Sequence, residues 1–294
     1  MPEPCAGALA AAREHEAAVF STLIAAARRR QQEAQANAPV PPRFLLEAAR
    51  SMAAHLGMPQ QRMEECLAPM ALWQLYLQAA VGAQRWDFAA VRASMPWSYE
   101  RVRAALLPLQ SHPQVVHAAF HMAAFPLVCA LIGTAWRDLY GGPLHLLVAS
   151  RNLAWFRLEG NRWVGETAEI ISTDPAGLRQ LVAGLRRGTI RRLLILVDGP
   201  QAPGPAGTHA LAGVSPALGI RTTLLEKIHA LGIPLVPVTH EWEEEGLVVT
   251  PQAALDPAAV GEAGYVPAVA THIEGLLRRH PEQWLNWNAA RIRT

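Results

Sequence analysis

The sequence predicts an α/β protein in which a mixed or mostly parallel sheet is covered by helices and preceded by a helical N-terminal region. From about residue 111 onward, short apolar runs alternate with helix-like runs, as in strands joined by crossover helices. The strand candidates are almost entirely apolar, which is typical of strands covered on both faces. Before residue 111, apolar residues recur at helical spacing instead.

The N-terminal region, residues 1–110, is expected to contain several helices separated by proline-rich breaks. Residues 38–42 read Ala-Pro-Val-Pro-Pro and end the first of them. Ser98 is a candidate N-cap for the last helix of the region. The other predicted helices cover residues 8–36, 43–57, 59–82 and 86–93.

The second region, residues 111–294, is expected to hold the sheet. The predicted helices cover residues 122–137, 175–187, 217–231 and 266–279. The predicted strands cover residues 114–120, 144–149, 153–158, 193–197, 234–238 and 247–250. A Gly/Pro-rich loop at 199–207 follows a buried strand, where α/β proteins commonly carry functional loops.

Composition narrows the functional class. Hydrophobic residues make up 51% and charged residues 17% of the chain, with a formal net charge of +2, which is globular and argues against a nucleic-acid partner. The three cysteines (Cys5, Cys66 and Cys129) are widely spaced and form no metal-ligand pattern, so reduced cytosolic thiols and no metal are expected. No signal peptide or membrane span is predicted.

His121 is the strongest candidate for chemistry. It closes an apolar run and opens a helix-like run, so it is expected at a strand-to-helix corner facing the crevice at the carboxyl end of the sheet. Imidazole titrates near neutral pH, which suits a general base. His117, four residues earlier inside the strand, is interpreted as structural.

Three stretches occur in one order along the chain. His121 ends a strand, Leu193–Pro200 forms a strand ending in Asp198, and Ala212–Ala217 forms an apolar turn containing Gly213. The chain then closes on Pro281-Glu-Gln-Trp284, followed by Trp287. Together these stretches resemble the bacterial lipid A biosynthesis (late) acyltransferases, of the lysophospholipid acyltransferase-like class, over about residues 110–294.

The resemblance implies transfer of an acyl group from a thioester of acyl carrier protein or coenzyme A to a hydroxyl or an amine. It implies His121 as general base, a catalytic or substrate-contacting role for Asp198, and substrate binding near Gly213. The acyl thioester is then a co-substrate, with no bound cofactor, and the acceptor is a small or carrier-bound molecule. A cytoplasmic protein is expected, with peripheral contact at the inner membrane as the alternative.

The sequence departs from the family pattern at Pro126. The family places an acid five residues after the histidine, and its usual N-terminal span is missing here. Three explanations stay open at this stage. Asp198 or Glu241 replaces the acid; the acceptor is an amine, which needs less help from a base; or the chain is a non-catalytic relative that binds acyl chains or a partner, with an eroded site.

Further residues are candidates for substrate contact. Arg151 follows a predicted strand and is expected either to bind a phosphate of the carrier, to polarise the thioester carbonyl, or to be solvated. Glu241 is a candidate substrate contact in an acidic run that also fits a solvated hairpin edge. Trp284 and Trp287 either anchor the tail or contact a membrane interface. Four arginines are candidates for carrier docking or a solvated helix end: Arg186, Arg187, Arg191 and Arg192.

Overall fold

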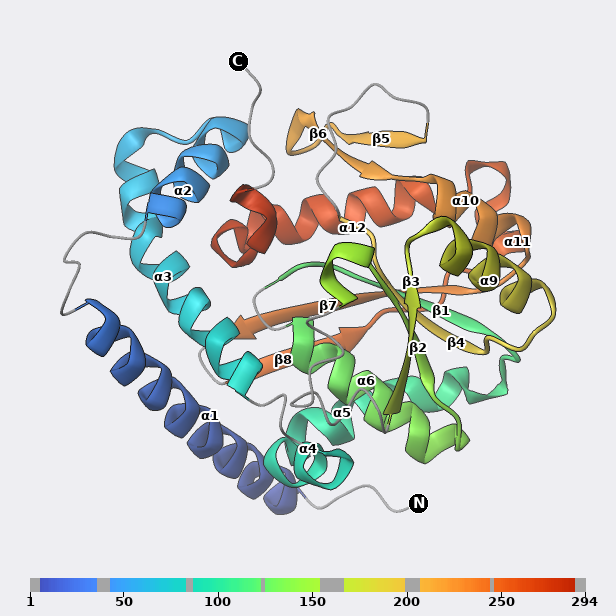
Figure 1. The fold of residues 1–294 in the computed structure, drawn as a ribbon, viewed down its shortest axis with the longest axis horizontal. Helices are drawn as coiled ribbons and strands as arrows, with labels where there is room; N and C mark the ends of the chain where they lie inside the picture. The colour runs from blue at the N-terminus through green and yellow to red at the C-terminus, as the bar shows by residue number, and fades with distance from the viewer. Residues whose placement is uncertain are drawn as a thin grey trace.

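Figure 1 shows a central sheet with helices on both of its faces. The structure is a computed structural model that describes residues 6–35, 43–82, 87–122, 125–153, 167–198, 207–243 and 246–288. Six strands lie in the order β3-β2-β4-β1-β7-β8, and all neighbours are parallel except β7 and β8. The predicted α/β class is therefore confirmed. The strands are β1 (Val115–Ala119), β2 (Leu144–Val148), β3 (Ala168–Ser172), β4 (Arg192–Leu196), β7 (Leu235–Glu243) and β8 (Gly246–Pro251).

The sheet separates two hydrophobic cores, because successive side chains of a strand point to opposite faces. In β1, Val115 and Ala119 belong to one core, whereas Val116 and Ala118 belong to the other. Strand β4 divides in the same way. Burial on both faces explains why these strands are apolar throughout. The helices of this region are α6 (Phe125–Tyr140), α9 (Pro175–Arg186), α10 (Thr223–Ala230), α11 (Pro257–Val260) and α12 (Val266–Arg279).

The N-terminal region is helical, as predicted. Its helices are α1 (Ala6–Gln35), α2 (Arg43–Leu56), α3 (Gln60–Gly82), α4 (Phe88–Ser94) and α5 (Pro96–Leu106). The predicted N-cap at Ser98 is wrong, because α5 already begins at Pro96, whose fixed φ suits the first turn. Ser98 instead donates from its backbone N–H and its hydroxyl to the buried carboxylate of Glu16 in α1.

Side chains from both sides of residue 110 share the two cores. The ring of Phe20 in α1 meets Trp242 in β7 edge-on, with centroids 4.8 Å apart. His55 Nδ1 in α2 lies 3.0 Å from the Ser215 hydroxyl. The N-terminal helices therefore pack directly on the sheet region and extend its cores.

Two predicted elements differ in the structure. The predicted helix 217–231 is wrong at its start, where β6 (Ser215–Arg221) pairs antiparallel with β5 (Thr208–Leu211). Pro216 and Gly219 disfavour a helix there, and Gly219 lies opposite Ala210 in the hairpin. The predicted strand 153–158 lies, apart from Leu153, outside the described residues. Strand β3 was not predicted, because its short sequence Ala-Glu-Ile-Ile-Ser carries little pattern.

None of the helices within the described ranges is long and apolar enough to cross a bilayer. The carboxyl ends of the parallel strands β1, β2, β3 and β4 meet at one edge of the sheet. In such folds that edge is where ligands bind.

Candidate functional site at the His121–Asp198 pair

Strand register brings His121 and Asp198 together. Strands β1 and β4 run parallel, with Ala119 opposite Leu196, and the Val197 N–H donates to the Ala119 carbonyl at 3.1 Å. His121 and Asp198 each follow their strand by two residues. Ala119 and Leu196 are register partners in parallel strands, and His121 and Asp198 each lie two residues further along. The two residues therefore leave the sheet next to each other.

The contact between the two side chains determines which nitrogen of a neutral His121 ring carries the proton. His121 Nδ1 lies 2.9 Å from Asp198 Oδ1, and the His121 backbone N–H donates to Asp198 Oδ2 at 2.8 Å. Because an ionised carboxylate can only accept, Nδ1 must carry the proton of the neutral ring. The lone pair is then on Nε2, which is the nitrogen able to act as a base.

Asp198 is only 1% exposed, yet its pKa lies below its ordinary value. Burial alone would raise the pKa of this carboxyl. The positive charge of the His121 imidazolium, when it is protonated, and the hydrogen bonds from His121 and Trp284 outweigh that effect. Asp198 is therefore an ionised carboxylate at neutral pH, as an orienting group for a histidine must be.

The C-terminal segment completes the surroundings of Asp198. Trp284 Nε1 donates to Asp198 Oδ2 at 2.6 Å, and Asn286 Nδ2 donates to the Asp198 carbonyl at 3.0 Å. Trp287 meets Trp284 edge-on at 4.5 Å between ring centroids and is fully buried. These two tryptophans therefore anchor the tail inside the protein, which leaves them unable to contact a membrane interface.

Pro126, where the family pattern has its acid, lies in the first turn of α6. Proline is well suited to that turn because its missing N–H has no helical partner there. Pro126 is buried, and the ring of its neighbour Phe125 lies 5.3 Å from the His121 ring. In this chain the carboxylate beside His121 thus comes from the end of β4 and not from α6.

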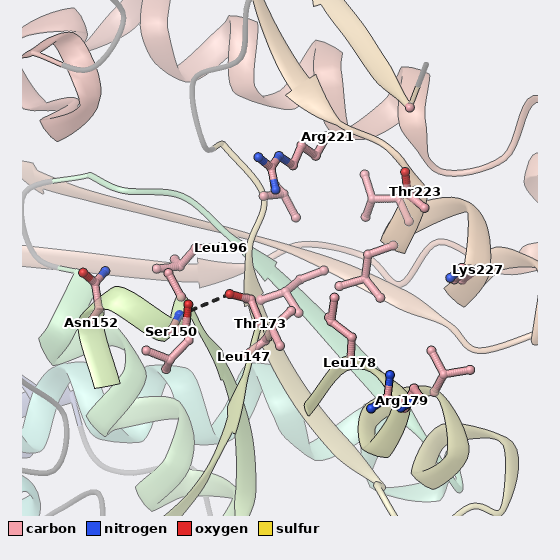
Figure 2. A pocket seen from close by; sticks show the side chains of 18 of the residues that line it. Leu147, Ser150, Asn152, Thr173, Leu178, Arg179, Leu196, Arg221, Thr223 and Lys227 are labelled. Atoms are coloured by element: carbon pink, nitrogen blue, oxygen red, sulfur yellow. Dashed lines mark hydrogen bonds between the residues drawn. The ribbon is translucent and has the colours of Figure 1, made fainter. Parts of the chain in front are cut away.

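His121 opens onto a cleft of about 1550 Å³ between α9 and the β6–α10 segment. Figure 2 shows this cleft, with Leu147, Thr173 and Leu196 along the sheet edge and Arg221 and Lys227 on the opposite wall. His121 is the member of the pair that reaches the cleft, since its side chain is 26% exposed. Asp198 remains behind it.

The other predicted contacts are not brought to the pair. Glu241 Oε2 in β7 lies 3.0 Å from His280 Nε2, and Glu241 is absent from the described lining of the cleft. The carboxylate in contact with His121 Nδ1 is that of Asp198.

Gly213 has a structural role instead. Its N–H donates to Glu274 Oε1 at 2.8 Å and its carbonyl accepts from Arg278, both in α12. A Cβ at this position would lie 2.1 Å from Glu274 Oε2, so a larger residue here would require the Glu274 side chain to move. Arg151 belongs to a short 3-10 turn whose neighbours Ser150 and Asn152 line the cleft, but its side chain lies outside the described residues.

Sequence reasoning missed His240, a buried residue of β7. His240 is fully buried, and its ring lies near the backbone carbonyls of Phe120 and Val238. Burial lowers the pKa of His240 to about 4, and the charges of Asp198 and His121 also act on it. It is therefore neutral near the pair. In the sequence His240 follows the predicted strand 234–238 as a lone histidine, and nothing there indicates that it lies near His121 and Asp198.

No family model matches the sequence of the chain, and no curated protein matches it either. Within the described ranges, no group of three or more histidine, cysteine, aspartate or glutamate side chains is placed to hold a metal ion. Three features bear on the function: the His121–Asp198 pair, the cleft beside it and the motif resemblance.

Proposed function

We propose that the protein is an acyltransferase that moves an acyl group from a thioester to a hydroxyl or amine, with His121 as general base. The observation that carries this proposal is the hydrogen bond between His121 Nδ1 and the buried carboxylate of Asp198. That bond orients the ring and places the proton of a neutral imidazole on Nδ1, and His121 lines the cleft.

The proposed reaction gives His121 and Asp198 separate roles. His121 Nε2 takes the proton of the acceptor as its oxygen or nitrogen attacks the thioester carbonyl carbon. The new C–O or C–N bond forms and a tetrahedral intermediate results; the C–S bond then breaks, and the His121 imidazolium returns the proton to the leaving thiolate, which departs as the thiol. Asp198 stabilises the imidazolium that exists between these steps and keeps its own proton count unchanged.

The acceptor can be either a hydroxyl or an amine. An amine acceptor was one explanation for the loss of the acid at Pro126, on the premise that no carboxylate assists the histidine. Because Asp198 contacts His121 Nδ1, that premise no longer applies. A hydroxyl and an amine are therefore equal candidates.

The donor follows from the resemblance and from the lining of the cleft. An acyl thioester of acyl carrier protein or coenzyme A is the donor class that the resemblance implies. Apolar side chains beside His121 supply a surface for an acyl chain, namely Leu147, Val148, Val182, Ile195, Leu196, Val197, Leu224 and Leu225. We place the enzyme in the cytoplasm or peripherally at the inner membrane on the same resemblance.

The test is an acyl-transfer panel. Octanoyl, dodecanoyl and hexadecanoyl thioesters of coenzyme A and of acyl carrier protein are incubated with hydroxyl and amine acceptors, and products are identified by mass spectrometry. His121→Ala is expected to lower the rate by about 10²–10⁴, the usual range for a general base. His112→Ala, whose side chain is absent from the described lining, is the matched control and should match the wild type.

The proposal fails on either of two results. Equal product from wild type and His121→Ala removes His121 from the mechanism. No product from any thioester, with a correctly folded protein, favours the alternative of a non-catalytic binding protein.

A further inference from the structure

The C-terminal strap, residues 281–288, lies along β7 beyond the point where β1 ends. Strand β1 stops at Ala119, whereas its parallel neighbour β7 runs on to Glu243. Gln283 of the strap is 1% exposed, and its Oε1 accepts from the Trp242 N–H at 3.0 Å. Its Nε2 donates to the Trp242 carbonyl at 2.9 Å. A side-chain amide thus satisfies both main-chain groups of a β7 residue and fastens the strap to the sheet.

The next residues of the strap reach both members of the candidate pair. The main chain of Trp284 forms an antiparallel bridge with Met122, the residue after His121. The indole of Trp284 donates to the Asp198 carboxylate at 2.6 Å. Asn286 Nδ2 donates to the main-chain carbonyl of Asp198 at 3.0 Å. The strap therefore contacts the chain on both sides of the His121–Asp198 hydrogen bond.

Contacts that do not involve Asp198 also hold the strap in place. Trp287 is fully buried, and its indole N–H donates to the Pro281 carbonyl at 2.6 Å, which closes the strap on itself. The same indole stacks on the ring of His55 in α2, with centroids 6.0 Å apart. Together with the amide of Gln283, these contacts make the strap a fixed support against which Asp198 is held.

We propose that Gln283 and Asn286 are positioning residues that hold Asp198 against the imidazole. Gln283 fixes the strap on β7, and Asn286 fixes the main chain of Asp198 while the Trp284 indole fixes its carboxylate. Two points of attachment on one residue restrict the rotation of its side chain, and an oriented carboxylate keeps His121 in one tautomer. The consequence for turnover rests on the proposed acyl transfer, whereas the consequence for the imidazole does not.

The tautomer of His121 gives a direct readout, because contact with Asp198 places the proton of the neutral ring on Nδ1. Protein carrying isotope-labelled histidine is measured by nitrogen NMR at a pH above the titration of imidazole. The signals of His121 are those lost in His121→Gln. Asn286→Ala and Gln283→Leu should each shift the tautomer equilibrium about threefold or more toward the Nε2-protonated ring, since each variant loses hydrogen bonds that hold Asp198 or the strap.

Gln114→Leu is the matched control. The Gln114 amide also donates to two main-chain carbonyls, at 2.9 and 2.8 Å, but it precedes β1 and lies at the opposite end of that strand from His121. This variant should keep the wild-type tautomer. Asn286 is half-buried and loses a single bond, so its variant tests the proposal independently of whether the Gln283 variant folds.

An unchanged tautomer in Asn286→Ala, or an equal shift in the Gln114 control, overturns the proposal. The NMR measurement needs no substrate, so a shifted tautomer in a protein that transfers no acyl group would refute the proposed function and leave the positioning role intact. With a productive thioester, Asn286→Ala should lower kcat about three- to tenfold and leave KM nearly unchanged, because Asn286 acts through Asp198 and not on the substrate. A change confined to KM contradicts the positioning role.

Discussion

At the scale of single residues, Asp198 receives three hydrogen bonds through its carboxylate, two from His121 and one from Trp284. The sequence predicted both members of the pair as residues at strand ends. It left open whether Asp198 or Glu241 meets the histidine, because both follow or occupy apolar strands and only strand order distinguishes them. The contact of Trp284 with Asp198 could not be predicted either, because a motif at the end of the sequence does not show where that segment packs.

Trp284→Phe tests whether the indole N–H positions Asp198. Losing a donor to the charged form raises the pKa of Asp198, so the acid limb of the pH–rate profile should move to higher pH. The turnover should also fall about tenfold or more, from the usual strength of a hydrogen bond to a charged group. Profiles of kcat/KM from acid to neutral pH give the measurement.

Trp287→Phe is the matched control for this prediction. Its indole N–H donates to the Pro281 carbonyl at 2.6 Å and not to Asp198. The variant is expected to keep the acid limb of the wild type. Identical shifts in both tryptophan variants would mean that general packing, and not the bond to Asp198, sets the profile.

At the scale of elements, the start of α6 explains how the site tolerates proline. The helix was predicted from residue 122 and begins at Phe125, with Pro126 in its first turn. Position 126 is where the family pattern has its acid. In this chain the same position lies in the first turn of α6 and is occupied by proline. The mistaken helix over β6 has a different origin, since apolar residues that pair in a hairpin and apolar residues on a helix face look alike over a few positions.

Pro126 variants test the claim that α6 no longer supplies an acid. Pro126→Ala should keep its activity, because neither residue contributes a carboxylate. Pro126→Asp should be no faster, since His121 Nδ1 is already bonded to Asp198, and burial of its side chain should destabilise the fold by about 1–3 kcal/mol. Turnover numbers and urea unfolding midpoints of the variants provide the measurement. A Pro126→Asp variant that is faster than the wild type would contradict the claim, because a carboxylate on α6 would then assist the histidine.

At the scale of the whole molecule, the two cores enclose histidines that the fold keeps neutral. Burial lowers the pKa of His117 to about 3 and that of His240 to about 4. The class of the fold could be predicted because strand and helix patterns alternate along the chain. The basic cleft could not, because Arg179, Arg221 and Lys227 come from three elements and only the tertiary structure brings them to one cavity.

The buried histidines make the protein less stable in acid. In the unfolded chain a histidine has a pKa of about 6.5, so below that pH the unfolded state binds more protons than the folded state. The free energy of unfolding should fall by roughly 1.4 kcal/mol per pH unit for each histidine as the pH drops from about 6 toward 4. Glu16, whose pKa is raised by burial, acts in the opposite direction near the acid end of this range.

Urea unfolding across this pH range measures the effect. His240→Gln should lessen the slope, whereas His112→Gln, at a half-buried position outside the cores, should leave it as in the wild type. A free energy that does not change between pH 6 and pH 4.5 would contradict burial of neutral imidazoles.

The most direct test of the central claim is the turnover of Asp198→Asn in the acyl-transfer assay, once a productive thioester and acceptor are known. An amide in place of the carboxylate loses the charge that holds the His121 tautomer and stabilises its cation. In a Ser-His-Asp triad the same change lowers turnover about 10⁴-fold. We predict a loss of that order, with unchanged near-ultraviolet circular dichroism. Turnover within about tenfold of the wild type would show that Asp198 does not serve the histidine.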